Sequence, residues 1–147
     1  MMNKHQEHWK SLPKDAQAFI KKIRTRVGKT INKHGLISRG DRVLAGFSGG
    51  TDSLAMLEML AERRKRMRVD YEVHALHVNI ETIPYRLNTD QAKAFCNAHD
   101  IVFHEHSEAI TIDSGSNNTC FICSWNRRRI LFEYARHINA NKVALGH

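Results

Sequence analysis

Residues 42–60 of the chain, RVLAGFSGGTDSLAMLEML, decide its fold. The apolar run at 42–47 has the length of a buried strand, and the residues after the string SGGTDS predict a helix from about 53 to 66. The two glycines between these segments let the backbone turn sharply and let a ligand approach closely. The stretch therefore predicts a strand, a glycine-rich loop and a helix in immediate succession.

The loop at 48–53 also predicts an anion site. The first amides of a helix have no partner within the helix, and the helix dipole adds partial positive charge, so a phosphate fits there. Ser48 and Ser53 can add hydroxyl hydrogen bonds, and Asp52 can help to hold the magnesium ion that accompanies ATP. The string is neither a Walker A loop, which needs a lysine, nor the dinucleotide fingerprint Gly-x-Gly-x-x-Gly. An ordinary strand-to-helix turn capped by Ser or Asp remains the structural alternative.

The rest of the chain alternates in the same way. Strands are expected at 71–79, 101–106 and 142–146, and helices at about 86–99 and 120–139. This order predicts an α/β fold, with a parallel sheet covered by helices on both faces. Ahead of it, residues 14–34 have apolar residues at helical spacing and a basic opposite face, which predicts an amphipathic helix.

Two parts follow from this order. We expect a basic helical segment over residues 1–40 and an ATP-binding α/β domain over 41–147. Ligands of open α/β sheets bind beyond the carboxyl ends of the strands. Because the sequence stops directly after a strand, we expect the domain to be truncated at its C-terminal end.

Composition restricts the class of protein. The 147 residues are 41% hydrophobic and 26% charged, which is typical of a soluble globular domain. No apolar run approaches the ~20 residues of a membrane helix, and the start lacks a signal-peptide core. We therefore expect a cytoplasmic protein without a membrane partner. The net charge of +8 favours polyanions, nucleic acid first, although it also serves solubility.

Cys120 and Cys123 begin the helix expected at 120–139. Their spacing lets both sulfurs face one ion, and a helix N-terminus favours thiolates. A zinc ribbon would need a second pair, so a different metal site, a redox pair or two partly buried thiols remain open. Cys96 is interpreted as a small core residue. His104 and His106 share a strand face but lack a third ligand nearby, so no zinc site is expected there.

Two groups of basic residues stand out. Arg127, Arg128 and Arg129 follow the cysteine pair and are either ligands for phosphate groups or a solvated helix face. The run from Arg63 to Arg68 is expected to be a solvated helix end. Few aromatic residues interleave the basic ones, so a base-stacking platform is not expected.

The string SGGTDS resembles the SGGxDS signature of the PP-loop, or N-type ATP pyrophosphatase, superfamily, whose enzymes cut ATP between the α and β phosphates and adenylate a substrate oxygen. Residues 35–60 and 120–147 resemble its tRNA 2-thiocytidine synthetase branch, which has a Gly-Asp-Arg lead-in, Cys-x-x-Cys followed by arginines, and a Leu-Gly-His strand end. The resemblance implies an adenine nucleotide alpha hydrolase-like fold. Thr51 stands where the branch usually has lysine.

The resemblance also implies a set of site residues. Cys120 and Cys123 would be two ligands of a four-iron, four-sulfur cluster whose third ligand lies beyond residue 147. Catalytic roles would fall to Asp52, Ser53, Cys120 and Cys123. The ATP site would comprise Ala45, Gly46, Phe47, Ser48, Gly49, Gly50, Asp52, Ser53, His77, Val78, Asn79, Gly146 and His147.

The implied reaction is adenylation of a nucleobase, namely cytidine in tRNA, with Mg²⁺-ATP, followed by replacement of the activated oxygen by sulfur. The implied partners are tRNA and a persulfide carrier that donates the sulfur, with a second copy of the chain as a further candidate. Two alternatives share the fold. One is a lysidine synthetase-like ligase, which has no need of the cysteine pair, and the other is a non-catalytic adenine-nucleotide-binding domain.

Overall fold

The computed structural model describes residues 10–81, 83–109 and 119–146. His147 and the turn-rich residues before Thr119 lie outside this part. Its contacts form two units, which divide between Leu36 and Ile37. The second unit contains, in chain order, β1 (Arg42–Gly46), α3 (Thr51–Met67), β2 (Glu72–Ile80), α4 (Thr89–Ala98), β3 (Val102–Glu108), α5 (Thr119–His137) and β4 (Lys142–Ala144).

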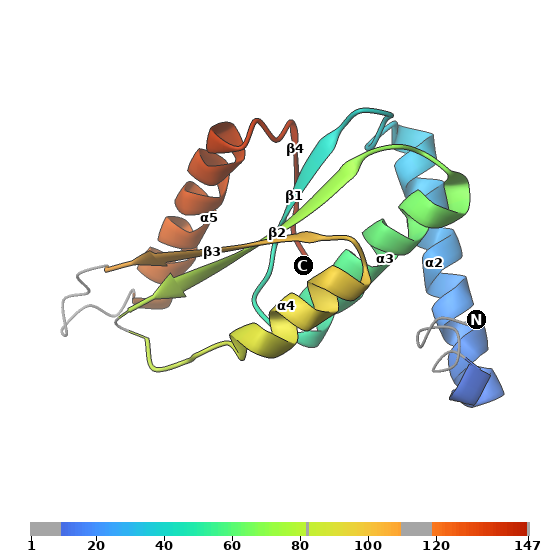
Figure 1. Cartoon of the computed structure of the whole chain (residues 1–147), viewed down its shortest axis with the longest axis horizontal. Coiled ribbons are helices and arrows are strands. Elements are labelled where there is room, and N and C mark those ends of the chain that lie inside the picture. Colours follow the sequence, from blue (N-terminus) through green and yellow to red (C-terminus); the bar gives the residue numbers. More distant parts are fainter. Residues whose placement is uncertain (1–9, 82, 110–118, 147) are drawn as a thin grey trace. The chain divides into compact units, whose positions relative to one another are not determined.

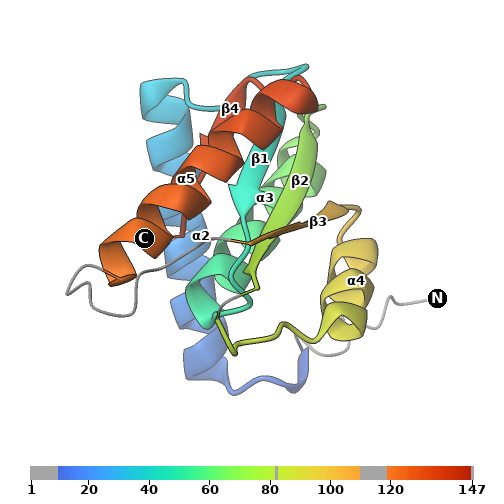
Figure 2. The same cartoon turned by 90° about the vertical axis from the view of Figure 1, so that its left-hand side faces the viewer.

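The four strands form one parallel sheet in the order β3-β2-β1-β4. The helices α3 and α4 cover one face and α5 covers the other (Figures 1 and 2). This arrangement follows from right-handed crossovers, because the chain moves from β1 to β2 and β3 in one direction and then returns past β1 to β4. The predicted parallel α/β fold with helices on both faces is confirmed.

The core lies on both sides of β1, whose three central residues are buried. On the α5 side, Leu44 and Leu76 of the sheet pack with Leu131 and Ala135 of the helix. On the other side, α3 supplies the fully buried Leu57. Burial on both faces explains why the strand is a continuous apolar run rather than an alternating one.

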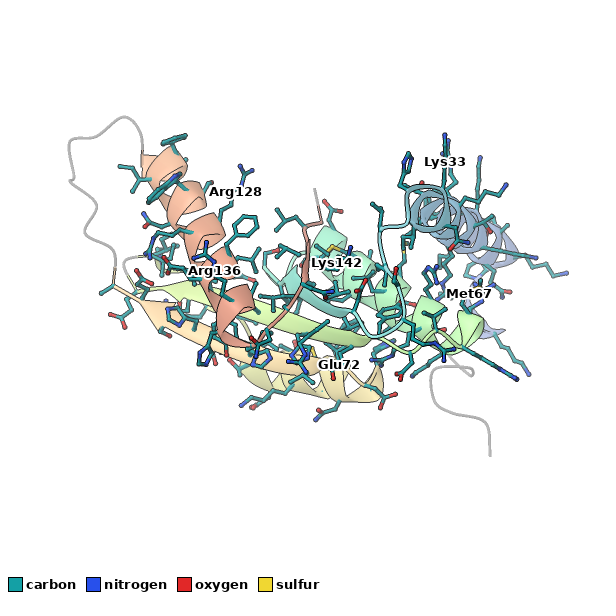
Figure 3. All side chains as sticks on the ribbon, turned by 90° about the horizontal axis from the view of Figure 1, so that it is seen from above. Lys33, Met67, Glu72, Arg128, Arg136 and Lys142 are labelled. Atoms are coloured by element: carbon teal, nitrogen blue, oxygen red, sulfur yellow. The ribbon has the colours of Figure 1, made fainter. Side chains whose placement is uncertain are left out.

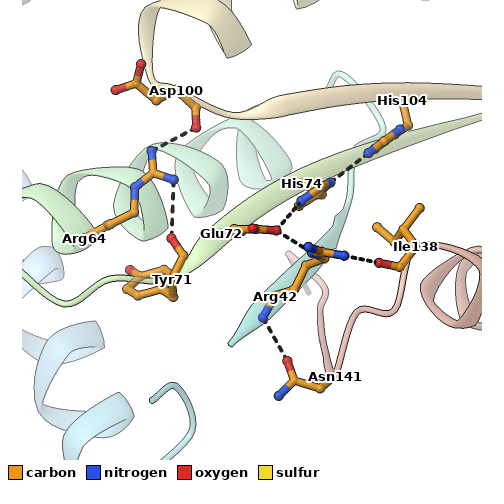
Figure 4. Close-up of polar contacts among 9 residues, drawn as sticks. All are labelled: Arg42, Arg64, Tyr71, Glu72, His74, Asp100, His104, Ile138 and Asn141. Carbon is orange, nitrogen blue, oxygen red and sulfur yellow. Dashed lines mark hydrogen bonds and ion pairs between the residues drawn. The ribbon is translucent and has the colours of Figure 1, made fainter. Parts of the chain in front are cut away.

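The Gly40-Asp41-Arg42 lead-in fastens the start of the sheet. Asp41 is buried and accepts hydrogen bonds from the Ser38 amide and the Asn141 carboxamide, both at 2.7 Å. These two donors hold the pKa of the Asp41 carboxyl below its usual value. Arg42 donates to Glu72 of β2 and to the carbonyl of Ile138 after α5 (Figure 4). The lead-in therefore joins the starts of β1, β2 and β4.

The basic run at the end of α3, from Arg63 to Arg68, differs from its prediction. The guanidinium of Arg64 donates to the carbonyls of Tyr71 and Asp100 (Figure 4). It also donates to the His99 carbonyl, and Lys65 pairs with the Asp100 carboxylate. These contacts tie the end of α3 to the turn between α4 and β3. Arg64 and Lys65 therefore stabilise the fold, whereas the prediction had placed them at a solvated helix end.

The first unit contains α2 (Lys14–His34), which occupies the residues predicted for the amphipathic helix. Pro13 stands at its N-cap, and Gly35 ends it in the left-handed conformation with φ 56°, donating to the Asn32 carbonyl. A boundary at residue 40 stays a prediction. In the described part of the chain, no helix has the length and apolar character needed to cross a membrane.

Candidate nucleotide-binding site

A cavity of about 920 Å³ opens at the carboxyl ends of β1, β2 and β4. The chain leaves β1 toward one edge of the sheet and reaches β4 on the other side, so the cavity lies at the point where the strand order reverses. This is where open α/β sheets bind ligands. The first turns of α3 and α5 both contribute to its lining.

The glycine-rich loop forms one wall. Gly49 has φ +85°, a conformation that favours glycine. The Ser53 hydroxyl donates to the Gly50 carbonyl at 2.9 Å, so the Ser48 hydroxyl is the donor in the 3.2 Å contact between the two serines. Ser48 in turn accepts the Gly50 amide at 3.2 Å. The hydroxyls therefore hold the loop in shape and already lie beside each other at the cavity wall.

The helix after the loop presents its unbonded end to the cavity. Its first intrahelical bond runs from the Leu54 amide to the Gly50 carbonyl at 3.1 Å. The amides of the three preceding residues come before that bond, and Thr51, Asp52 and Ser53 all line the cavity. Such an end carries partial positive charge and suits an anion.

Gly146 allows β4 to reach this helix end. A Cβ atom at this position would lie 3.1 Å from the backbone carbonyl of Asp52 and from the amide nitrogen of Ser53. This distance is shorter than most Cβ contacts in proteins, and backbone does not move aside easily, so glycine favours this close approach. The chain after β4 and the start of α3 therefore form a continuous wall.

His77 has a positioning contact that the sequence did not indicate. Its side chain is buried, and Nδ1 donates to the Phe47 carbonyl at 2.9 Å. A carbonyl only accepts, so the ring carries its proton on Nδ1. This bond fixes the end of β1 against β2, directly before the glycine-rich loop.

Most of the residues predicted for the ATP site come together at the cavity. Ala45 is enclosed within β1, and the side-chain direction at Gly49 faces Leu87 and Tyr85. The Asn79 carboxamide accepts from Arg86 at 2.8 Å and donates to Ser107 at 3.3 Å. His147 lies outside the described residues. The predicted residues that do line the cavity are Gly46, Phe47, Ser48, Gly50, Asp52, Ser53, His77, Val78, Cys120, Cys123 and Gly146.

The two cysteines of α5 both line this cavity but differ in environment. Cys120 is exposed, whereas Cys123 is buried and packs with Ile80. Cys96 lies in α4, and its complete burial raises the pKa of the thiol to about 11. It is a core residue, as predicted. Among the described residues, no group of three or more His, Cys, Asp or Glu side chains can hold a metal ion.

The three arginines that follow have different surroundings. Arg127 and Arg128 line the cavity. Arg129 instead pairs with Glu108 of β3 and with Glu133 one turn along α5. Its guanidinium lowers the pKa of the Glu108 carboxyl. Among the described residues, the charged lining consists of two guanidinium groups and the Asp52 carboxylate, a net positive set that suits a polyphosphate.

The segment between β2 and α4 contributes cavity residues that the sequence did not predict. Tyr85 lines the cavity, and its hydroxyl donates to the Ser48 carbonyl at 3.2 Å. Ile83 lies in the same lining. This segment has no periodic pattern, but it follows the carboxyl end of a strand, and that position alone marks it as a candidate for ligand contact.

The strand histidines form a network away from the cavity. His74 Nδ1 lies 2.8 Å from His104 Nε2 (Figure 4). The Tyr134 hydroxyl lies 3.1 Å from His104 Nδ1. The outer nitrogen of His74 lies 3.2 Å from the Glu72 carboxylate, which can only accept. We call Arg42, Glu72, His74, His104 and Tyr134 the histidine network. Burial, and then the nearby His74 and His137, lower the pKa of His104, which favours its neutral form.

The fold is of the adenine nucleotide alpha hydrolase-like class, and its cavity lies where open α/β sheets bind ligands. The chain is 36% identical over 135 residues to a tRNA-cytidine(32) 2-sulfurtransferase of Citrifermentans bemidjiense, covering 88% of this chain and 52% of that protein. It is 33% identical to the enzyme of the same name from Dichelobacter nodosus, covering 88% of this chain and 49% of that protein. No protein-family model matches the chain.

A solved structure of a tRNA-modifying protein also resembles this chain. The U34-tRNA thiolase NcsA from Methanococcus maripaludis, with its [4Fe-4S] cluster, superposes with a TM-score of 0.74 at 25% identity, covering 87% of this chain and 45% of that one. The predicted resemblance to the tRNA thiolation branch of the PP-loop superfamily is confirmed by these relatives. The chain spans about half the length of the curated relatives it matches.

Proposed function

We propose that this chain is the ATP-binding part of a cytoplasmic enzyme that adenylates a cytidine of tRNA and replaces the activated oxygen with sulfur. The observation that carries the proposal is that one cavity is lined by the glycine-rich loop, by both cysteines of α5 and by Arg127 and Arg128. The similarity to tRNA sulfurtransferases supports the choice of substrate.

ATP would lie across the loop with its phosphates at the start of α3. The amides of Thr51, Asp52 and Ser53 and the serine hydroxyls would bind phosphate oxygens. Asp52 is exposed and fits the role of a magnesium ligand, because Mg²⁺ beside a nucleotide is held by one or two carboxylates and the phosphates. The adenine would lie against the edge of β2 at His77 and Val78, bordered by Gly46 and Phe47.

Positioning and charge stabilisation would carry most of the catalysis. The base oxygen attacks the α-phosphate, the bond between the α-phosphorus and the bridging oxygen breaks, and pyrophosphate leaves with one additional negative charge on that oxygen to be stabilised. Arg127 and Arg128 face the space into which it would depart. The terminal sulfur of the carrier's persulfide then attacks the base carbon and AMP departs. A second thiol then attacks the carrier sulfur of the resulting disulfide, which leaves the sulfur on the base and forms a disulfide between that thiol and the carrier.

Cys120 and Cys123 fit two positions of an iron–sulfur cluster, because they lie one turn apart and both face the cavity. A cluster held by three cysteines would leave one iron open to an incoming sulfur species. The described residues do not supply a third protein ligand, since Cys96 is enclosed in α4. The cysteine pair favours thiolation over lysine ligation, which has no use for it.

The test is release of pyrophosphate from Mg²⁺-ATP in the presence of unmodified tRNA transcripts. We expect release that depends on tRNA and on Asp52. The matched control is Asp90→Asn, which removes an exposed carboxylate from the first turn of α4, as Asp52→Asn does in α3. Binding of ATP without release on any tRNA would favour a non-catalytic nucleotide-binding domain. Incorporation of lysine into the tRNA would favour a ligase.

A further inference from the structure

The helix α5 exposes large aromatic side chains on the side away from the sheet. Phe121, Trp125 and Phe132 are 69%, 56% and 54% exposed. The same helix packs Leu131 and Ala135 against the sheet, so it is apolar on two faces. Three exposed aromatic residues on one helix are unusual, and such surfaces commonly mark interaction sites.

These residues fall on one line together with two arginines. At 100° per residue, the positions 121, 125, 128, 132 and 136 recur on one side of a helix. All five side chains are exposed. We call Phe121, Trp125, Arg128, Phe132 and Arg136 the α5 stripe; Figure 3 shows its two arginines on the helix.

The α5 stripe is continuous with the cavity. Arg128 belongs to both, because it also lines the cavity beside Arg127. The nearby Glu133 is on a neighbouring line of the helix and is already paired with Arg129 at 2.9 Å. The stripe itself therefore contains cations and aromatic rings but no acid.

The chemistry of the stripe favours one occupant. Aromatic rings stack on unpaired bases, and arginines between them pair with the phosphates of the same strand. A second copy of the chain is a poorer fit: in a two-fold contact the stripe would meet itself and bring arginines together without an acid to pair them. The net charge of +8 agrees with a polyanionic partner.

We propose that the α5 stripe docks an unpaired segment of RNA and leads it to the cavity. The aromatic and basic residues alternate on one side of the helix although they do not alternate in sequence, because residues three or four apart are neighbours on a helix. The inference deepens the proposed function, on which it rests for the identity of the substrate.

The experiment measures binding of the full chain to a fluorescein-labelled RNA hairpin with an unpaired loop and to a blunt duplex of the same stem. We expect the hairpin to bind more tightly. Trp125→Ala and Phe132→Ala should each weaken hairpin binding about tenfold and leave its salt dependence unchanged. Arg136→Ala should reduce the slope of log affinity against log salt by about one.

A matched control is Met67→Ala, which removes an apolar side chain with the same 54% exposure as Phe132 from α3. It should leave RNA binding unchanged. A second measurement uses Trp9→Phe, which makes Trp125 the sole tryptophan. Its emission should be quenched by the hairpin and not by the duplex.

Two outcomes overturn the proposal, and a third separates it from the proposed function. If Trp125→Ala and Phe132→Ala bind the hairpin like the parent chain, the stripe is not the RNA surface, whatever the pyrophosphate assay gives. If Trp125 emission depends on protein concentration and not on RNA, the stripe is a contact between copies. If the hairpin binds through the stripe but no pyrophosphate is released, the proposed function fails and the stripe stands.

Discussion

The cavity and the histidine network both contain buried or half-buried polar groups, but they use them differently. In the network, Glu72, His74, His104 and Tyr134 form a chain of mutual contacts in which each donor meets an acceptor. In the cavity, the start of α3 and two arginines face open space. Polar groups that satisfy one another hold the fold together, whereas those left facing a cavity are available to a ligand. The difference locates the site independently of any motif.

The largest contrast is expected between cysteines. Cys120 is exposed at the cavity, whereas the pKa of Cys96 is raised to about 11 by burial. Alkylation by iodoacetamide at pH 7.5 should modify Cys120 at least about a hundredfold faster than Cys96, because the thiolate is the reacting form and Cys96 is also inaccessible. Mass spectrometry of the digested protein measures both rates. Equal rates would mean that α4 does not enclose Cys96 in solution.

The arginines of α5 give the next contrast. Arg127→Ala should weaken ATP binding by about tenfold or more, the usual loss for a hydrogen bond to a charged group, and should leave the melting temperature unchanged. Arg129→Ala should do the opposite, since it loses Glu108 and Glu133 but does not line the cavity. Calorimetric titration and thermal unfolding measure the two effects. If both variants lowered the ATP affinity equally, Arg127 and Arg129 would not have the separate roles of ligand contact and structural ion pair.

Two glycines with the same backbone conformation test the loop. Gly49 and Gly40 have φ +85° and +83°, but a Cβ at Gly49 would meet Leu87 at 2.4 Å and the Tyr85 hydroxyl at 2.9 Å, while nothing lies within 4 Å at Gly40. Both alanine variants should lose roughly 1 kcal/mol of stability from the left-handed conformation. Only Gly49→Ala should also weaken ATP binding, by about tenfold, because the wall of the cavity must move. A similar loss of affinity in Gly40→Ala would show that the effect is global.

The smallest effect is expected from acidifying the network. The pKa of His104 is lowered by burial and by His74 and His137, so the unfolded chain binds a proton more readily than the folded one. Stability should be fully present above the unfolded pKa near 6.5 and should fall as pH decreases below it. His104→Gln should flatten the change in denaturant midpoint between pH 7.5 and 5.5. If the denaturant midpoint of this variant changed as much between pH 7.5 and 5.5 as that of the parent chain, protonation of His104 would not explain the loss of stability.

Local sequence patterns predicted the strands, the helices and the glycine-rich loop, because each depends on neighbours in sequence. They did not predict the contacts across the sheet. The hydrogen bonds from His77 to the Phe47 carbonyl and from Tyr85 to the Ser48 carbonyl join residues that are far apart in sequence. Hydrophobic periodicity cannot predict such contacts. The predicted helix at 86–99 is shorter in the structure, Thr89–Ala98, because Asn88 caps it by accepting the Gln91 amide.

The helix α5 shows a second feature that hydrophobic periodicity does not predict. Its apolar residues lie on two faces, so hydrophobic periodicity identifies the sheet-facing side and hides the α5 stripe. The separate surroundings of Arg127 and Arg129 likewise depend on where β3 ends relative to the helix. Predicting either feature requires knowing how elements far apart in sequence pack together.

The most direct test of the nucleotide site is a ¹⁵N–¹H correlation spectrum of the labelled chain titrated with Mg²⁺-ATP. The largest shifts should fall on the amides of Gly50, Thr51, Asp52, Ser53 and Gly146, with little change at His74 and His104. Shifts confined to the histidine network or to α2, or an unchanged spectrum at saturating ATP, would contradict a phosphate site at the start of α3.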